Sequence, residues 1–180
     1  EPVAAGRFGW KARISSLPEQ VAKAFLQDIG MASASHPYPQ GDCTAAQLDC
    51  LQLASETSSP LEDTEVSETV IKLVLAYAES LEINRDMPLD SKALALFNAT
   101  GCQGCHVPEL EPGLVAFTDL LLHDMGESLS DSLPSQFAGP SEWRTAPLIN
   151  VGLNERFLHD GRATTLEEAI LWHGGEAAAS

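Results

Sequence analysis

The chain contains one compact cysteine motif, Cys102-Gln103-Gly104-Cys105-His106, and the rest of the sequence can be interpreted outward from it. Two thiols separated by two residues lie on one side of a tight helical turn, so each can add to one of the two vinyl groups of a single porphyrin. The imidazole that follows is then placed to bind the iron as the proximal ligand. The spacing therefore predicts one covalent haem c, attached through Cys102 and Cys105 and bound by His106.

A Cys-x-x-Cys pair has two other common uses, in zinc sites and in redox dithiols. Half of a zinc site needs a second pair of ligands at short spacing, and the sequence offers none. A thioredoxin-like dithiol follows a strand and opens a helix. Here residues 91–100, which precede the motif, have the apolar spacing of a helix. The histidine directly after the second cysteine favours haem.

Composition limits the classes of partner. Among 180 residues, 10 Lys and Arg stand against 26 Asp and Glu, which gives a net charge of −16. No basic stripe is present to neutralise the phosphates of a nucleic acid or an anionic membrane surface. The longest apolar run, residues 70–78, is interrupted by Lys72 and is far shorter than the roughly 20 residues of a membrane-spanning helix. We expect a redox partner protein with a basic patch, no nucleic acid and no membrane span.

The other two cysteines, Cys43 and Cys50, lie in and after a turn-rich stretch. Covalent haem attachment takes place outside the bacterial cytoplasm, in a compartment where disulfides persist. We therefore expect a periplasmic or otherwise exported protein and a disulfide between Cys43 and Cys50. Two buried free thiols are the alternative.

Helical patterns recur along the chain, and no alternation typical of strands persists. The sequence Ser16-Leu-Pro-Glu19 is a capping box and predicts a helix from 17 to 29 that ends at Gly30. Further helices are expected over 65–81, 91–100 and 166–173, with loops over 31–64 and 107–141. The expected fold class is all-α, a cytochrome c-like haem domain with long loops.

An internal repeat relates the two ends of the chain. Phe8, Arg13, Ser16, Leu17 and Glu19 recur, with Thr for Ser, 149 positions later in residues 157–168. A haem motif displaced by the same offset would fall before residue 1. We expect residues 1–85 to be the helical tail of a first haem domain whose haem-carrying part is absent, and residues 86–180 to be a cytochrome c-like haem domain. Chance similarity between two capped amphipathic helices is the alternative.

Several longer motifs carry a resemblance to a known family. They are Gly-Arg-Phe-Gly-Trp-Lys-Ala at 6–12, Thr-Asp-Leu-Leu-Leu-His-Asp-Met-Gly at 118–126, Glu-Trp-Arg-Thr-Ala-Pro-Leu at 142–148, Phe-Leu-His-Asp-Gly-Arg-Ala at 157–163 and Thr-Leu-Glu-Glu-Ala-Ile-Leu-Trp-His-Gly-Gly-Glu-Ala at 165–177. The chain resembles the C-terminal part of the bacterial di-haem oxidoreductase family, described as peroxidase-like or thiol-oxidoreductase-like proteins. This family is distantly similar to di-haem cytochrome c peroxidase. The absence of a first haem segment argues against a complete peroxidase in this chain alone.

The resemblance also implies the second axial ligand. In the peroxidase relatives this ligand lies eight residues beyond the Thr of a Thr-Leu-Glu sequence, which here indicates His173. A methionine sulfur from Met125 is the main alternative, and it would raise the redox potential. The full set of candidates is His36, His123, His159, His173, Met31, Met87 and Met125. Arg144 and Arg162 are expected to pair with haem propionates, with surface ion pairs as the alternative.

Three functions follow from these ligands. A bis-histidine haem predicts an electron-transfer module, because no axial position is open to peroxide. A peroxidase would instead need an open haem face and an acid–base group, for which His159, Asp160 and Glu176 are candidates. A structural haem domain in a larger assembly is the third possibility. His123 and His159 are expected to hydrogen-bond carboxylates or propionates.

Overall fold

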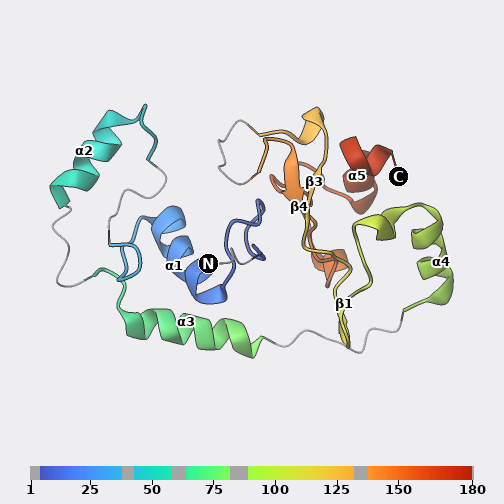
Figure 1. Cartoon of the computed structure of the whole chain (residues 1–180), viewed down its shortest axis with the longest axis horizontal. Helices are drawn as coiled ribbons and strands as arrows, with labels where there is room; N and C mark the ends of the chain where they lie inside the picture. The colour runs from blue at the N-terminus through green and yellow to red at the C-terminus, as the bar shows by residue number, and fades with distance from the viewer. Residues whose placement is uncertain (1–4, 38–42, 58–63, 82–88, 132–137, 180) are drawn as a thin grey trace. The chain divides into compact units, whose positions relative to one another are not determined.

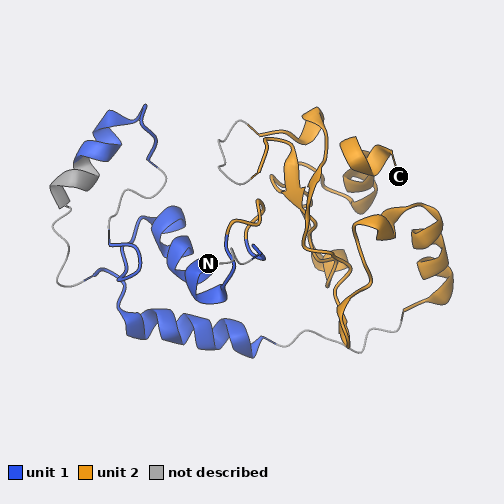
Figure 2. Cartoon of the chain, in the orientation of Figure 1, with its two compact units in different colours: residues 1–8, 14–82 blue, residues 9–13, 83–180 orange. Residues whose placement is uncertain are grey.

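The chain divides into two compact units, which are described separately. The computed structural model describes residues 5–37, 43–57, 64–81, 89–131 and 138–179. Unit 1 comprises residues 1–8 and 14–82, and unit 2 comprises residues 9–13 and 83–180 (Figure 2). The expected boundary after residue 85 lies outside the described residues, and the assignment of residues 1–85 to a haem domain stays a prediction. Within the described part of the chain, no helix is long and apolar enough to span a membrane.

Unit 1 is built on two packed helices, α1 (Leu17–Ile29) and α3 (Glu68–Ser80), which lie side by side (Figure 1). The hydroxyl of Ser16 accepts a hydrogen bond from the Glu19 backbone N at 3.4 Å, and Gly30 ends α1 in the left-handed region at φ 69°. The predicted helix from 17 to 29 is thus confirmed. The core of unit 1 consists of Ile14, Val21, Ala22, Ala32 and Val66.

A second part of unit 1 carries the disulfide. Cys43 and Cys50 are bonded, with their Cα atoms 5.9 Å apart, so the expected pairing is present. Cys50 belongs to α2 (Leu48–Thr57), a helix in the segment that was expected to be loop. That expectation was wrong because α2 is short and the Pro, Ser and Asp residues that flank it in the sequence are typical of loops.

Unit 2 combines short helices with two small sheets. The helix α4 (Ser91–Ala99) leads to the 3₁₀ turn η1 (Cys102–Gly104). The strands β1 (Glu109–Glu111) and β2 (Leu114–Val115) form one antiparallel pair, and β3 (Leu122–Asp124) and β4 (Glu142–Arg144) form another. The remaining elements are η2 (Glu127–Leu129), η3 (Val151–Leu153), α5 (Leu166–Leu171) and η4 (Gly175–Ala178). The core of unit 2 contains Ala116, Thr118, Leu129, Trp143, Ala163 and Ala169.

The expected all-α, cytochrome c-like class is therefore contradicted, because the chain has a mixed α and β structure. The described residues form five α-helices and two antiparallel sheets of two strands each. Each strand has only two or three residues, which is too short for alternation of apolar and polar side chains to be recognised. Besides α1, the segments expected to be helical at 65–81, 91–100 and 166–173 match helices, and these helices are slightly shorter than expected.

The internal repeat is also a repeat of local geometry. Phe8 pairs with Ile14 in an isolated antiparallel bridge, and 149 positions later Phe157 pairs with Ala163 in the same way. The backbone N of each phenylalanine donates to the opposite carbonyl at 2.9 Å. Positive φ angles occur at the matching positions Gly9 and Leu158, and again at Ala12 and Gly161. The hydroxyl groups of Ser16 and Thr165 then cap α1 and α5. Chance similarity of two helices would not reproduce these loop conformations.

Gly175 should be essential to the stability of unit 2. Its φ of +55° is unfavourable for other residues, and a Cβ at this position would collide with the Asp124 carbonyl and the Gly126 amide. We expect Gly175→Ala to lower the free energy of unfolding by about 1–3 kcal/mol, measured by denaturant titration. Gly152→Ala is the control, because nothing lies within 4 Å of its added Cβ, and its effect should stay within about 0.5 kcal/mol. Equal effects of the two substitutions would contradict the close approach.

Candidate haem site

The two motif thiols and the motif histidine share a single turn of chain. Helix α4 ends at Thr100, Gly101 follows with φ 81°, and the backbone N of His106 donates to the Cys102 carbonyl at 3.0 Å. Both cysteines are half-buried free thiols, and the Thr100 Oγ1 lies 3.3 Å from the Cys102 Sγ. Neither thiol is therefore consumed in a disulfide.

The surroundings of Cys105 argue against the two rival uses of the motif. Burial raises the pKa of the Cys105 thiol, and the negative charges of Asp119 and Glu176 raise it further. A redox dithiol needs the opposite, a thiol whose pKa is lowered so that the thiolate forms. A zinc site needs about four ligands, but the described residues contain no group of three or more His, Cys, Asp or Glu side chains that could hold a metal.

His106 is held in the tautomer that binds a metal through Nε2. Its Nδ1 lies 2.9 Å from the Phe117 carbonyl oxygen, and because a carbonyl can only accept, Nδ1 carries the proton. The Nε2 atom therefore presents a lone pair. Burial lowers the pKa of His106 more than this hydrogen bond raises it, which keeps the ring neutral as a ligand must be. Phe117 itself has a positive φ of 52°, a strained conformation that directs its carbonyl at the ring.

A backbone carbonyl also fixes the tautomer of His173. It follows α5, and its Nδ1 lies 2.7 Å from the Ala169 carbonyl oxygen, one helical turn earlier. Its Nε2 is therefore also left with a lone pair. A backbone carbonyl that holds the second nitrogen of a ligating histidine is a common arrangement at metal sites.

The structure places these two rings at a separation that is compatible with a shared iron. The ring centroids of His106 and His173 are 6.4 Å apart. A first-row metal lies about 2.1 Å from an imidazole nitrogen, and that nitrogen lies about 1.1 Å from the ring centre, so two axial rings on one iron have centres about 6.4 Å apart. Apolar side chains on the neighbouring helices, Leu96 on α4 with Ile170 and Leu171 on α5, are exposed and would suit contact with a porphyrin. The residues present therefore fit a haem.

Met125, the alternative ligand, lies close to the chain that follows His173. Met125 contributes its backbone to the close packing of the loop after β3 against Gly174, whose added Cβ would meet the Met125 carbonyl at 3.0 Å. Ligation of the iron by the Met125 sulfur stays the alternative to ligation by His173. Met31 and His36 belong to unit 1, and Met87 lies outside the described residues.

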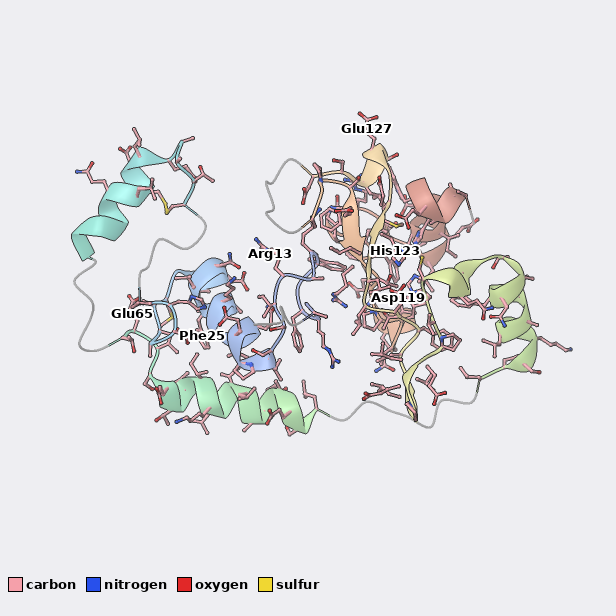
Figure 3. All side chains as sticks on the ribbon, viewed as in Figure 1. Arg13, Phe25, Glu65, Asp119, His123 and Glu127 are labelled. Atoms are coloured by element: carbon pink, nitrogen blue, oxygen red, sulfur yellow. A yellow bond between two sulfur atoms is a disulfide. The ribbon has the colours of Figure 1, made fainter. Side chains whose placement is uncertain are left out.

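His123 bridges two carboxylates beside the paired rings. Its Nε2 lies 2.8 Å from Asp119 Oδ2 and its Nδ1 lies 2.9 Å from Glu176 Oε2; Asp119 and His123 are labelled in Figure 3. Glu176 also accepts a hydrogen bond from the Asp124 backbone N at 3.1 Å. Burial lowers the pKa of His123, but the two carboxylates outweigh burial and the pKa is raised. The contacts of Glu176 with His123 and Asp124 hold the chain that follows His173 against β3.

A second cluster surrounds Trp143, whose role the sequence did not reveal. The ring of His159 stacks on the Trp143 ring with centroids 3.6 Å apart, and Lys11 Nζ lies 3.5 Å from the same ring centre. The Trp143 Nε1 donates to the Leu129 carbonyl at 2.9 Å. Lys11 also donates to the carbonyls of residues 139 and 140 at 3.0 and 2.9 Å. The only signal in the sequence was a tryptophan inside a family motif.

The two arginines expected at propionates have protein partners. Arg144 donates from Nε to the Gly9 carbonyl at 2.9 Å, and Arg162 pairs with Asp160 at 2.6 Å and donates to the Ser128 carbonyl at 2.7 Å. Arg162 also lies over the Trp172 ring, 5.0 Å from its centroid. Contact of either arginine with a propionate stays a prediction.

The His123 bridge should make stability depend on pH. Because its folded pKa is raised, protonated His123 stabilises the fold below its unfolded pKa of about 6.5, and this contribution is lost as the pH rises through the folded value. We expect the stability deficit of His123→Gln to be largest near about pH 5 and to shrink by about pH 8, measured by denaturant titration. His159→Gln is the control with opposite slope, because burial lowers the pKa of His159. A His123→Gln deficit that does not change with pH would contradict the bridge.

Comparison with known proteins identifies the family. The family model described as "Di-haem oxidoreductase, putative peroxidase" matches residues 1–180. No curated protein and no solved structure matches the chain. The family implies a haem cofactor and redox chemistry, which agrees with the donor set around His106. The chain belongs to the di-haem oxidoreductase family.

Proposed function

We propose that this chain is an electron-transfer domain with one covalent haem c bound by two axial histidines. Cys102 and Cys105 would each add an S–H across a vinyl group of the porphyrin, and His106 and His173 would bind the iron through Nε2. When bound, the haem supplies reversible one-electron redox chemistry at its iron. The domain would relay electrons to or from a catalytic haem or a redox partner.

The observation that carries this proposal is the pairing of the two imidazoles. Both Nδ1 atoms are held by backbone carbonyls, and the ring centres are 6.4 Å apart. Two imidazoles tend to give a lower potential than a histidine–methionine pair. Because both rings are fixed by the chain, little ligand movement would accompany a change of charge at the site, which favours fast electron transfer over binding of a substrate.

A peroxidase at this same site receives less support from the structure. It would need an open axial position, whereas the His173 ring centroid lies 6.4 Å from that of His106. The candidate acid–base groups are also engaged: His159 stacks on Trp143, Asp160 pairs with Arg162, and Glu176 binds His123. The geometry thus favours a relay over a catalytic centre in this chain.

The proposal extends to compartment and partner. Covalent haem attachment and the Cys43–Cys50 disulfide both favour a periplasmic or otherwise exported protein. The net charge of −16 favours a partner with a basic patch, attracted over a long range at low salt.

Replacing His173 tests the ligand set. The protein is produced with a haem c attachment system, and its mass should exceed that of the polypeptide by one haem. The ferric protein should give the low-spin electron paramagnetic resonance signal of two imidazoles. We expect His173→Ala to give a high-spin signal, because one axial position loses its ligand.

His159→Ala is the matched control for this experiment. It removes another unit 2 histidine, one that stacks on Trp143 rather than facing His106, and it should leave the low-spin signal unchanged. An unchanged signal in His173→Ala, or a colourless protein, would overturn the proposal. Loss of the low-spin signal in His159→Ala would show that the ligand assignment is wrong.

Electron transfer should also depend on salt. We expect the rate with a basic redox protein to fall at least tenfold between about 10 mM and 300 mM salt, because the Debye length shrinks and screens the acidic surface. Stopped-flow reduction with an acidic redox protein of similar potential is the comparison, and there the rate should rise or stay constant. Reduction too slow to measure with either protein would favour a purely structural haem.

A further inference from the structure

The His123 bridge is anchored at one end beside the support of His106. Asp119 Oδ2 lies 2.8 Å from His123 Nε2, and Asp119 comes two residues after Phe117, whose carbonyl oxygen holds the His106 ring. Thr118, between them, is completely buried, and its hydroxyl donates at 2.7 Å to the backbone carbonyl that directly follows β4. A buried hydroxyl with a satisfied hydrogen bond gives this end of the bridge a fixed place in unit 2.

The segment that carries His173 is short and ends on two glycines. The helix α5 has only six residues, and Ile170 and Leu171 at its end are exposed. Short helices are marginally stable by themselves, and the glycines at 174 and 175 restrict the backbone little. The hydrogen bonds that His173 makes to its own helix move with that helix, so they alone do not fix its ring relative to His106.

Glu176 connects this segment to β3. Its Oε2 lies 2.9 Å from His123 Nδ1, and its Oε1 accepts a hydrogen bond from the Asp124 backbone N at 3.1 Å. In the antiparallel sheet His123 and Asp124 pair with Trp143 and Glu142 of β4, and Trp143 is buried. Both carboxylate oxygens of Glu176 are therefore used on a strand that is fixed within unit 2.

We infer that Glu176 is a positioning residue that acts through His123 and Asp119 to set the distance between the His106 and His173 rings. The bridge starts two residues after the carbonyl that holds one ring and ends three residues after the other ring. It links the two ring positions directly, whereas the chain between them runs through most of unit 2. The inference rests on the proposed role of His173 as an axial ligand, because Glu176 acts on the iron only through that ring.

Cyanide binding to the ferric, haem c-loaded chain tests this inference, because cyanide can bind only when an axial ligand leaves. Glu176→Ala should raise the observed rate of cyanide binding at least about tenfold, because His173 is released more often. The rate is measured by stopped-flow absorption. Glu167→Ala is the matched control, because Glu167 is an exposed carboxylate at the start of α5, and its rate should stay within about twofold of the native rate.

A double variant separates positioning from a general weakening of the fold. In His173→Ala an axial position is already open, so adding Glu176→Ala should change the cyanide rate by less than about twofold. Glu176→Gln guards against misfolding of the alanine variant, because it keeps the length of the side chain and one oxygen that can accept from the Asp124 N. Its rate should lie between those of the native chain and Glu176→Ala.

Three results would overturn the inference. They are the native cyanide rate in both Glu176 variants, an equal rise in Glu167→Ala, and an equal rise from Glu176→Ala with and without His173. The low-spin signal of the native chain is recorded before cyanide is added. Its absence would contradict the proposed function, whereas its presence together with an unchanged cyanide rate in Glu176→Ala would contradict only this inference.

Discussion

Two backbone carbonyls that fix the orientation of two imidazoles are the constraint on which this structure depends. The Phe117 carbonyl holds His106 and the Ala169 carbonyl holds His173, so both rings present Nε2 lone pairs without any help from a metal. Local backbone features lie beside both contacts. Phe117 adopts a positive φ, and Gly174 and Gly175 let the chain after α5 pack tightly on the loop after β3.

The haem motif could be proposed from the sequence because its chemistry is local. Its three candidate side chains lie within five residues, at the spacing that attachment of a porphyrin requires. The α1 boundaries were predictable for the same reason, since Ser16, Pro18, Glu19 and Gly30 are strong local signals for a helix start and stop. His173 was proposed as a ligand from a family resemblance, and its proximity to His106 depends on the fold.

What the sequence could not show depends on long-range contacts or on very short elements. Lys11 reaches Trp143 from more than a hundred residues away, and neither residue carries a local sign of that contact. The four strands are stabilised by pairing and by contacts with the rest of unit 2, because two or three residues cannot define a strand by pattern. Asp119 and Glu176 were likewise unrelated until the fold placed His123 between them.

The repeat shows how one local design can serve two chemical purposes. A bridged loop with two positive φ angles and a hydroxyl cap fixes where the following helix begins, and hence which residue lies eight positions beyond the cap. At that position unit 1 has Ala24 and unit 2 has His173, so only unit 2 offers an imidazole there. The helices that follow the shared loop also differ in length, because α1 continues to Ile29 whereas α5 ends at Leu171. The repeated loop therefore fixes where each helix begins, and the side chains of the helix that follows decide what chemistry each unit can support.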